Sequence, residues 1–247
     1  MPTPPATWFE RDPLELAPLL LGGVLCRADA SGTVALRLTE VEAYRGADDP
    51  GAHTFRGRTP RNATMFGPGG HVYCYFTYGM HHAVNIVAGP EGFGWGVLVR
   101  AGEVVDGAPL ALERRSARRA SRPTGELARG PGNVAQALGA TLADDGAALL
   151  DAAHSSPGHR AGPNVSPGHR VGPEASPGHR VGPEARIEMT PLWSFEPAPE
   201  PPAHRTGPRV GVSGPGGDAS AFPWRFWIPG EPSVSAYRAA APRRPKP

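Results

Sequence analysis

Lysine and cysteine are nearly absent from this sequence of 247 residues, which contains one lysine, Lys246, and two cysteines, Cys26 and Cys74. Two cysteines are too few for a disulfide framework and lack the spacing of a zinc site, so a reducing compartment is expected. The sequence also has no apolar run long enough to span a membrane, and its N-terminal stretch lacks the basic start of a signal peptide. These absences predict a cytoplasmic protein with no metal site and no membrane partner.

Neither sign of charge is in excess, because 25 basic residues oppose 23 acidic ones and the formal net charge is +2. This balance permits a nucleic-acid partner without demanding one. Nearly every basic residue is arginine, and Ala, Gly and Pro are also abundant, which indicates a GC-rich coding sequence. The arginine content is therefore weak evidence for DNA binding. The chain is long enough to bury a real core, in one large domain or two small ones.

A stretch of low complexity interrupts the chain. Residues from about 155 to 185 contain three tandem units, SPGHRAGPNV and two copies of SPGHRVGPEA, which have no apolar face and are predicted to form a disordered insertion. A metal-binding tract is the alternative for the recurring histidines, but proline and glycine leave nothing to fix their geometry. The later segment, rich in aromatics and valine, is expected to return to the first part as strands. The predicted boundaries are a flexible N-terminus at 1–8, one domain formed by 9–154 and 186–238, the insertion at 155–185 and a tail at 239–247.

The segment TVALRLTEVEAY has the two-residue period of a β-strand and ends in two glutamates. On this period one face carries Val34, Leu36, Leu38, Glu40, Glu42 and Tyr44. A core does not accept bare carboxylates, because an ion is costly to desolvate unless it is paired. Two interpretations are open from the strand alone. Either a bulge turns the strand and both glutamates become surface charges, which the strand by itself favours, or acid is placed at the mouth of the core for a chemical purpose.

A β-hairpin is predicted with strands at 72–77 and 82–87, followed by a third strand at 95–100. Tyr78 lies at its tip, where an exposed aromatic side chain is suited to wedge between stacked bases. Tyr73, on the first strand, is interpreted as a cross-strand packing residue.

Three arginines precede this hairpin among turn residues, namely Arg56, Arg58 and Arg61. Their positions suit contacts with DNA phosphates. A solvated loop is the alternative interpretation.

Several motifs occur in the order and at the relative spacing of a known family. They are EVEAYRGADDPGAH, RTPRNATMFGPGGHVYCYFTYGMHHAVNIV, GVLVRAGEVVDG, GPGNVAQALG, RVGV and PWRFWIPGEPSVS. Together they resemble the alkyladenine (3-methylpurine) DNA glycosylase family through most of the chain outside the repeats. The resemblance implies a compact single α+β domain on a curved antiparallel β-sheet with a protruding hairpin, and no cofactor.

The same resemblance implies a monofunctional hydrolase that initiates base excision repair. Such an enzyme flips damaged purines, among them 3-methyladenine, 7-methylguanine, hypoxanthine and ethenoadenine, out of duplex DNA and hydrolyses their bond to deoxyribose. The implied partner is double-stranded DNA containing damaged purines, bound by a monomer associated with a bacterial nucleoid. Two features depart from the family pattern: Asn133 stands in GPGNV where lysine is common, and the repeats have no counterpart.

The resemblance also implies roles for individual residues. Glu42 matches the glutamate that holds and activates water, and Arg100 matches an arginine that helps to hold the same water. The walls of the base pocket match Tyr44, His53, Tyr75 and Asn85, of which Asn85 crowds the exocyclic amine of guanine. Tyr78 matches the intercalating wedge. A backbone carbonyl within 209–212 is expected to complete the water site.

The residue types suit this chemistry on physical grounds. A glycosidic bond breaks through an oxocarbenium-like sugar, which requires water on the face opposite the departing base and a carboxylate nearby. Glu42 supplies the carboxylate, and Arg100 is expected to lie across the sheet from it. Tyr44 and Tyr75 offer electron-rich faces to a cationic methylated purine. Glu40 is assigned a structural or solvated role.

The scarcity of lysine argues against an enzyme that nicks the strand through a Schiff base, because Lys246 lies in the tail. Removal of Met1 would expose the secondary amine of Pro2, but the sequence that follows lacks the pattern of formamidopyrimidine glycosylases. Two other classes stay open. A non-catalytic protein that binds DNA lesions would release no base, and a hydrolase of small nucleosides would need no wedge at Tyr78.

Overall fold

The computed structural model describes residues 4–77, 81–116, 124–150 and 192–240. Their strands form one sheet and are β1 (Val24–Asp29), β2 (Gly32–Arg45), β3 (Val72–Thr77), β4 (His81–Ala88), β5 (Trp95–Asp106), β6 (Ala128–Arg129), β7 (Leu149–Leu150), β8 (Leu192–Glu196), β9 (Arg205–Gly207) and β10 (Arg225–Trp227). The strand order is β3-β4-β5-β2-β1-β8-β7, while β6 pairs with β5 and β10 pairs with both β2 and β9. Among these strands only β7 and β8 pair in parallel. The predicted α+β class with an antiparallel sheet is confirmed.

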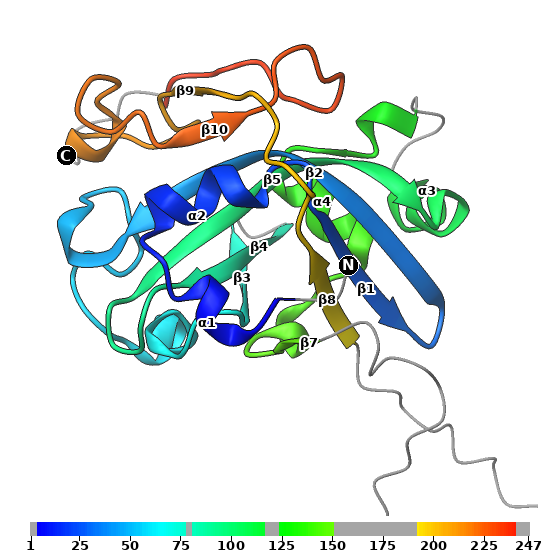
Figure 1. Ribbon diagram of the computed structural model, residues 1–247, viewed down its shortest axis with the longest axis horizontal. Coiled ribbons are helices and arrows are strands. Elements are labelled where there is room, and N and C mark those ends of the chain that lie inside the picture. The colour runs from blue at the N-terminus through cyan, green and yellow to red at the C-terminus, as the bar shows by residue number, and fades with distance from the viewer. Residues whose placement is uncertain (1–3, 78–80, 117–123, 151–191, 241–247) are drawn as a thin grey trace, which may run out of the picture.

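Four α-helices accompany the sheet in the described part of the chain: α1 (Ala6–Phe9), α2 (Pro13–Leu20), α3 (Ala108–Ser116) and α4 (Pro131–Leu138). The start of α2 is fixed by Asp12, whose side chain accepts a hydrogen bond from the Leu14 N–H at 2.9 Å. Helix α4 begins with Pro131 and ends at Gly139, whose φ of 71° is a left-handed conformation that glycine adopts without strain. In Figure 1, α1 and α2 lie in front of the sheet.

The predicted hairpin is present as the antiparallel pair β3–β4. The third strand is longer than expected, because β5 continues from Trp95 to Asp106. Tyr78 at the hairpin tip and the repeats at 155–185 lie outside the described residues.

Strand β2 changes the face that it presents to the core. Its register with β5 shifts between Leu38 and Glu40, and again between Glu40 and Val41. Leu38 and Val41 both belong to the hydrophobic core, although strict alternation would place them on opposite faces. The prediction of one face from Val34 to Tyr44 is therefore wrong beyond Leu38, because the irregularity turns Glu40 and Glu42 away from the core.

The segment after residue 191 returns to the sheet as strands, as expected. Strand β8 pairs with β1, and β10 pairs with β2 directly beside the two glutamates. Figure 1 shows β9 and β10 running along the upper edge of the sheet. No helix among the described residues is both long and apolar enough to cross a membrane.

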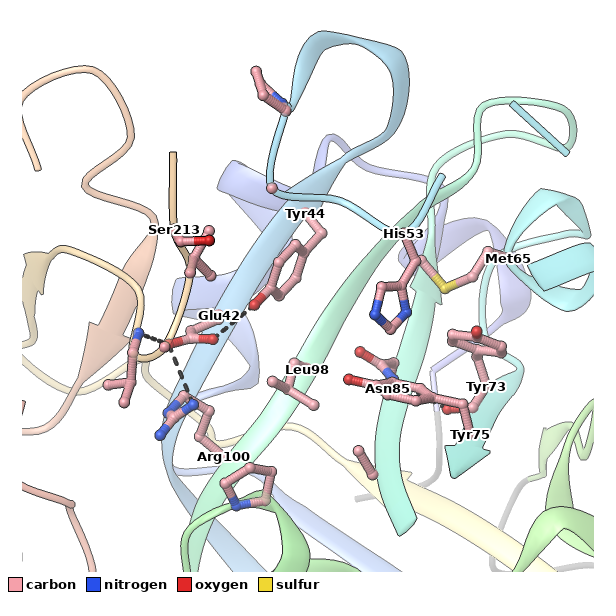
Figure 2. A pocket seen from close by; sticks show the side chains of 17 residues that line it. Glu42, Tyr44, His53, Met65, Tyr73, Tyr75, Asn85, Leu98, Arg100 and Ser213 are labelled. Atoms are coloured by element: carbon pink, nitrogen blue, oxygen red, sulfur yellow. Dashed lines mark hydrogen bonds and ion pairs between the residues drawn. The ribbon is translucent and has the colours of Figure 1, made fainter. Parts of the chain in front are cut away.

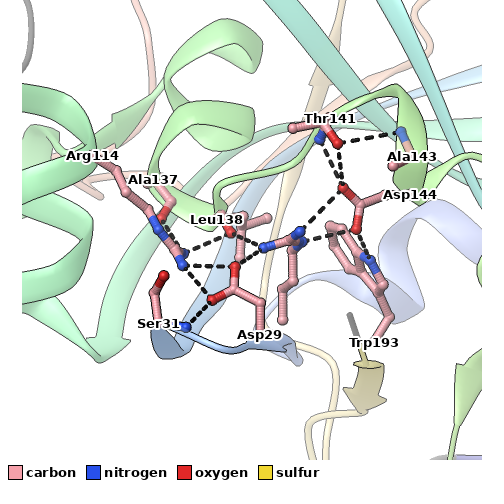
Figure 3. A network of polar contacts seen from close by, with 10 residues as sticks. Asp29, Ser31, Arg114, Ala137, Leu138, Thr141, Ala143, Asp144 and Trp193 are labelled. Carbon is pink, nitrogen blue, oxygen red and sulfur yellow. Dashed lines mark hydrogen bonds and ion pairs between the residues drawn. The ribbon is translucent and has the colours of Figure 1, made fainter. Parts of the chain in front are cut away.

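A buried polar network fastens β8 to the chain that precedes residue 151 (Figure 3). Asp144 Oδ1 accepts hydrogen bonds from Arg27 Nε and from Trp193 Nε1, each at 2.9 Å. Leu149 of β7 also pairs directly with Trp193 of β8. The two described segments that end at Leu150 and begin at Leu192 therefore lie side by side in the sheet.

Candidate active site

A cavity of about 290 Å³ lies over the face of the sheet to which Glu42 turns. Beneath it runs one row of directly paired residues, composed of Tyr73 in β3, Asn85 in β4, Leu98 in β5, Glu42 in β2 and Arg225 in β10. Directly paired residues of antiparallel strands point to the same face, so the sheet itself brings these side chains together. Figure 2 shows Glu42 and Tyr44 on one side of the cavity and His53, Tyr73 and Tyr75 on the other.

The carboxylate of Glu42 is fully buried and has three partners. Its Oε1 accepts a hydrogen bond from the Val210 N–H at 2.7 Å and lies 3.4 Å from Nη1 of Arg100. Its Oε2 accepts a hydrogen bond from the Tyr44 hydroxyl at 2.9 Å. The carboxylate is therefore held in one orientation at the edge of the cavity (Figure 2).

The segment 209–212, in which backbone was expected near the water, does reach the site. Val210 contributes its N–H to Glu42, and Gly211, Val212 and Ser213 line the cavity.

Arg100 is only 6% exposed and is shared between the two glutamates. Its Nε donates to Glu40 Oε1 at 2.9 Å, and its Nη1 pairs with Glu42. Burial acts to lower the pKa of Arg100, but the carboxylates of Glu42 and Glu40 outweigh it and raise the pKa above its ordinary value. A permanent positive charge therefore lies beside the candidate water site.

Glu40 is fully buried, which corrects two expectations. The strand is irregular, as the bulge interpretation requires, yet neither glutamate becomes a surface charge. Of the two roles assigned to Glu40, the solvated one is wrong. The physical reason is that the residue is satisfied internally, by Arg100, by Arg225 Nε at 2.6 Å and by the Ser235 N–H at 3.0 Å.

Tyr44 is supported from behind by a buried ion pair. The guanidinium carbon of Arg209 lies 4.5 Å from the centroid of the Tyr44 ring. Arg209 Nη2 donates to Asp49 Oδ1 at 2.6 Å, and neither of these two residues is more than 1% exposed. Burial, reinforced by the charge of Glu42, raises the pKa of Tyr44 well above its ordinary value, so the hydroxyl stays a donor.

The opposite wall is aromatic. The rings of His53 and Tyr75 meet edge to face with centroids 4.6 Å apart, and Tyr75 stacks on Tyr73 at 5.3 Å. Partial burial, together with the charge of Arg61, lowers the pKa of His53, which favours the neutral ring. Tyr73 packs across the strands as predicted, but it also lines the cavity, which was not predicted.

Asn85 completes the floor. The residue is 5% exposed, and its Nδ2 donates to the Tyr73 carbonyl at 3.2 Å. Among the described residues no donor pairs with Oδ1. The amide is therefore fixed from one side and offers its oxygen to a bound molecule.

The three arginines of the loop after His53 are all exposed. Arg61 Nη2 donates to the Phe76 carbonyl at 2.9 Å and so ties this loop to β3. Arg56 lines a wider groove of about 1170 Å³ that adjoins the cavity and also contains Phe55 and Tyr237. Phosphate contacts and a solvated loop are both compatible with these positions.

Several residues of the site were not singled out from the sequence. Arg225 and Ser235 bind Glu40, Asp49 pairs with Arg209, and Met65 of the 3-10 helix Pro60–Phe66 lines the cavity. The motif PWRFWIPGEPSVS contains both Arg225 and Ser235, so the available signal was their place in a family motif. Tyr78, expected at the tip of the hairpin, lies outside the described residues.

Comparisons with known proteins agree with this arrangement. The family described as Methylpurine-DNA glycosylase (MPG) matches residues 7–232. A protein of Streptomyces avermitilis named "Putative 3-methyladenine DNA glycosylase" is 47% identical over 238 residues, covering 96% of this chain and 92% of its own. A protein of Leifsonia xyli subsp. xyli with the same name is 45% identical over 232 residues, covering 93% and 90%. The chain therefore belongs to the methylpurine-DNA glycosylase family and is a DNA glycosylase, a hydrolase that acts in DNA repair.

Proposed function

We propose that this protein flips alkylated or deaminated purines out of duplex DNA and hydrolyses their N-glycosidic bond with one water molecule, held by Glu42 and Arg100. The observation that carries the proposal is the buried carboxylate of Glu42, fixed by the Val210 N–H, the Tyr44 hydroxyl and Arg100 at the edge of an aromatic cavity. A carboxylate so held is suited to orient water and to stabilise positive charge on the sugar.

The bond changes follow from this geometry. The N-glycosidic electron pair leaves with the base, and the sugar develops oxocarbenium character next to the Glu42 carboxylate. The water oxygen then bonds to the anomeric carbon, and its proton passes to the carboxylate. A methylated purine departs readily because it is already cationic, whereas hypoxanthine is neutral and must gain a proton as it leaves.

The cavity walls are proposed to hold the flipped base. Tyr44 would cover one face of the purine, and Tyr75 with His53 would cover the other. The oxygen of Asn85 would face the base edge, where the amide crowds the exocyclic amine of guanine. A neutral His53 adds no repulsion to a cationic base.

The contacts with DNA are proposed from exposure and from the family resemblance. Arg56, Arg58 and Arg61 would meet phosphates, and Tyr78 would fill the space that the flipped base leaves. We also propose that 9–154 and 186–238 act as one domain, which is supported by the pairing of β8 with β1 and of β10 with β2.

Excision from defined duplexes tests the function. Duplexes that each contain 3-methyladenine, 7-methylguanine, hypoxanthine or ethenoadenine should release a free base, and the strand should stay intact until alkali is added. The sequence contains a single lysine, Lys246, so few side-chain amines are available to form a Schiff base. Direct nicking, or trapping by borohydride, would contradict hydrolysis by water.

The variant Glu42→Gln tests the role of the carboxylate. It keeps the side-chain shape and removes the charge, so the single-turnover rate on a hypoxanthine duplex should fall by about 100-fold or more, while lesion binding is retained. Glu103→Gln is a matched control, because Glu103 is an exposed residue of β5 that pairs with Arg37. Near-normal excision by Glu42→Gln would remove the basis of the proposal.

A further inference from the structure

Four buried ions alternate in sign from the C-terminal part of the chain to the cavity. Arg225 pairs with Glu40, Glu40 pairs with Arg100, and Arg100 pairs with Glu42. The exposed fraction of the residue is 3% for Arg225, 6% for Arg100 and 0% for both glutamates. The four charges sum to zero, so the group is compensated only while every member is present.

Glu40 uses both oxygens to connect these elements. Oε1 accepts the Nε–H of Arg100 at 2.9 Å and that of Arg225 at 2.6 Å, whereas Oε2 accepts the Ser235 N–H at 3.0 Å. Arg225 Nη2 in turn donates to the Ser235 carbonyl at 2.7 Å, which closes a ring of contacts. The Nε–H of Arg100 therefore binds the carboxylate of Glu40, whose orientation is fixed by Arg225 and Ser235.

The other end of Arg100 faces the candidate water site. Nη1 reaches Glu42 at 3.4 Å, and among the described residues Nη2 has no hydrogen-bond partner. Because the guanidinium is planar, fixing Nε fixes the directions in which both Nη groups donate.

The C-terminal segment 231–238 also contacts the backbone next to Val210, the other residue that holds Glu42. The Gly211 N–H donates to the Arg238 carbonyl at 3.4 Å, and Gly211 follows Val210, whose N–H binds Glu42. Ser233 is bound to Thr39 of β2 at 2.7 Å. The segment 231–238 therefore supports both partners of Glu42. It contacts Gly211 next to Val210, and it binds Glu40, which holds Arg100.

We propose that Glu40 is a positioning residue of the glycosylase reaction: with Arg225 and Ser235 it holds the Arg100 guanidinium in the orientation that binds the attacking water. The inference rests on the proposed function of Arg100 and Glu42. A positioning role differs from a purely structural one. Excision would depend on the contact between Glu40 and Arg100 even when the fold is stable.

Two variants separate these roles. Glu40→Met removes the acceptor of the Arg100 Nε–H and leaves one buried positive charge uncompensated, so it should lower both the melting temperature and the single-turnover rate. Adding Arg225→Met removes that excess charge and replaces the ion pair by apolar volume, so the melting temperature should recover. Excision should stay about 100-fold slower than in the wild type, with unchanged lesion affinity, because Arg100 remains unfastened. Recovery of the rate together with the melting temperature would overturn the proposal.

A spectroscopic measurement keeps the test independent of activity. The Nε–H of Arg100, assigned from its loss in Arg100→Lys, should give a slowly exchanging NMR signal in the wild type and a shifted, faster-exchanging one in the double variant. Glu231→Gln is the control, because it frees the same segment from Arg37 without touching Arg100. Fast exchange in the wild type would contradict the contact between Glu40 and Arg100. A protected signal in a wild type that excises no damaged purine would instead refute the proposed function.

Discussion

At the scale of single residues, burial decides which groups carry charge near the cavity. Arg209 and Asp49 keep theirs because each satisfies the other, and removing either one would leave an unpaired buried ion at a cost of about 3–5 kcal/mol. Cys74 and Tyr73 lie on β3, where no cation of the described residues pairs with either, and both are 2% exposed. Burial raises the pKa of each to about 12, so both stay neutral.

The raised pKa values of Cys74 and Tyr73 predict that the folded protein loses stability in alkali. In the unfolded chain Cys74 and Tyr73 would release their protons near ordinary pKa values of 9.0 and 10.0, whereas the folded protein retains them to about 12. Below pH 9 both states are protonated and nothing changes. Between about pH 9 and about pH 12 the unfolded state binds fewer protons, so the free energy of unfolding falls by up to about 1.4 kcal/mol per pH unit for each group.

Urea unfolding at about pH 8 and about pH 10.5, on either side of the Cys74 onset, measures the effect. Cys74→Ala should be less stable at both values, because it loses buried apolar volume, but the difference between them should shrink. An unchanged difference would show that Cys74 ionises equally in both states.

The sequence predicted part of the candidate site and missed the rest for a physical reason. The motif positions alone predict that Glu42, Arg100 and Tyr44 lie in one site. The partners that fix them are remote: Val210 binds Glu42 across 168 positions, and Arg225 binds Glu40 across 185. No local periodicity reports such contacts, so the sequence does not distinguish a structural role of Glu40 from a solvated one.

At the scale of elements, the irregularity in β2 has the largest effect on the site. A shift of one residue exchanges the two faces of a strand, so Leu36 and Leu38 face the core before the shift, while Glu40 and Glu42 turn away from the core after it. A period-two pattern contains no sign of such a shift. The strands at 72–77 and 95–100 were predictable because both are short runs rich in aromatic and β-branched residues.

The hairpin β3–β4 carries the prediction for Tyr78. Tyr78→Ala should impair flipping, because unstacking a base costs a few kcal/mol and the vacated space must be filled. Excision from duplex DNA should therefore fall more than excision from a single strand or a mismatch, measured at single turnover. Equal losses on the three substrates would place Tyr78 in the pocket or the core.

Phe76→Ala provides a comparison on the same hairpin. Phe76 is 42% exposed on β3 and its ring lies 5.2 Å from that of His82. It does not line the cavity. Its removal should affect the three substrates alike, which would separate a wedge from general hairpin packing.

At the scale of the whole molecule, the two described segments that flank 151–191 meet in the sheet. Leu150 pairs with Ser194, and Leu149 pairs with Trp193, so Leu192 lies within about 10 Å of Leu150 on ordinary strand spacings. The architecture was predictable from segments on both sides of the repeats, because each has its own apolar pattern. Their mutual pairing was not, since it depends on the partners that the first segment offers.

Deletion of 155–185 tests whether folding and excision require the repeats. Ten residues, 151–154 and 186–191, would remain between the strands and reach up to about 33 Å, more than the gap requires. The deleted units lack the apolar content to form a core, so the melting temperature and the excision rate should stay near those of the full chain. A collapse of folding would show that the repeats form an integral element.

The row from Tyr73 to Arg225 bears on how the proposed base pocket would discriminate among purines of different size. Its side chains sit on neighbouring strands held about 4.8 Å apart by backbone hydrogen bonds, so the floor cannot widen for one purine and narrow for another. The width of this floor would therefore be the same for every purine. Under the proposed function, adjustment to different purines would be left to the loops at 50–53 and 210–213, and part of the discrimination would come from the DNA, through the free energy needed to open each base pair.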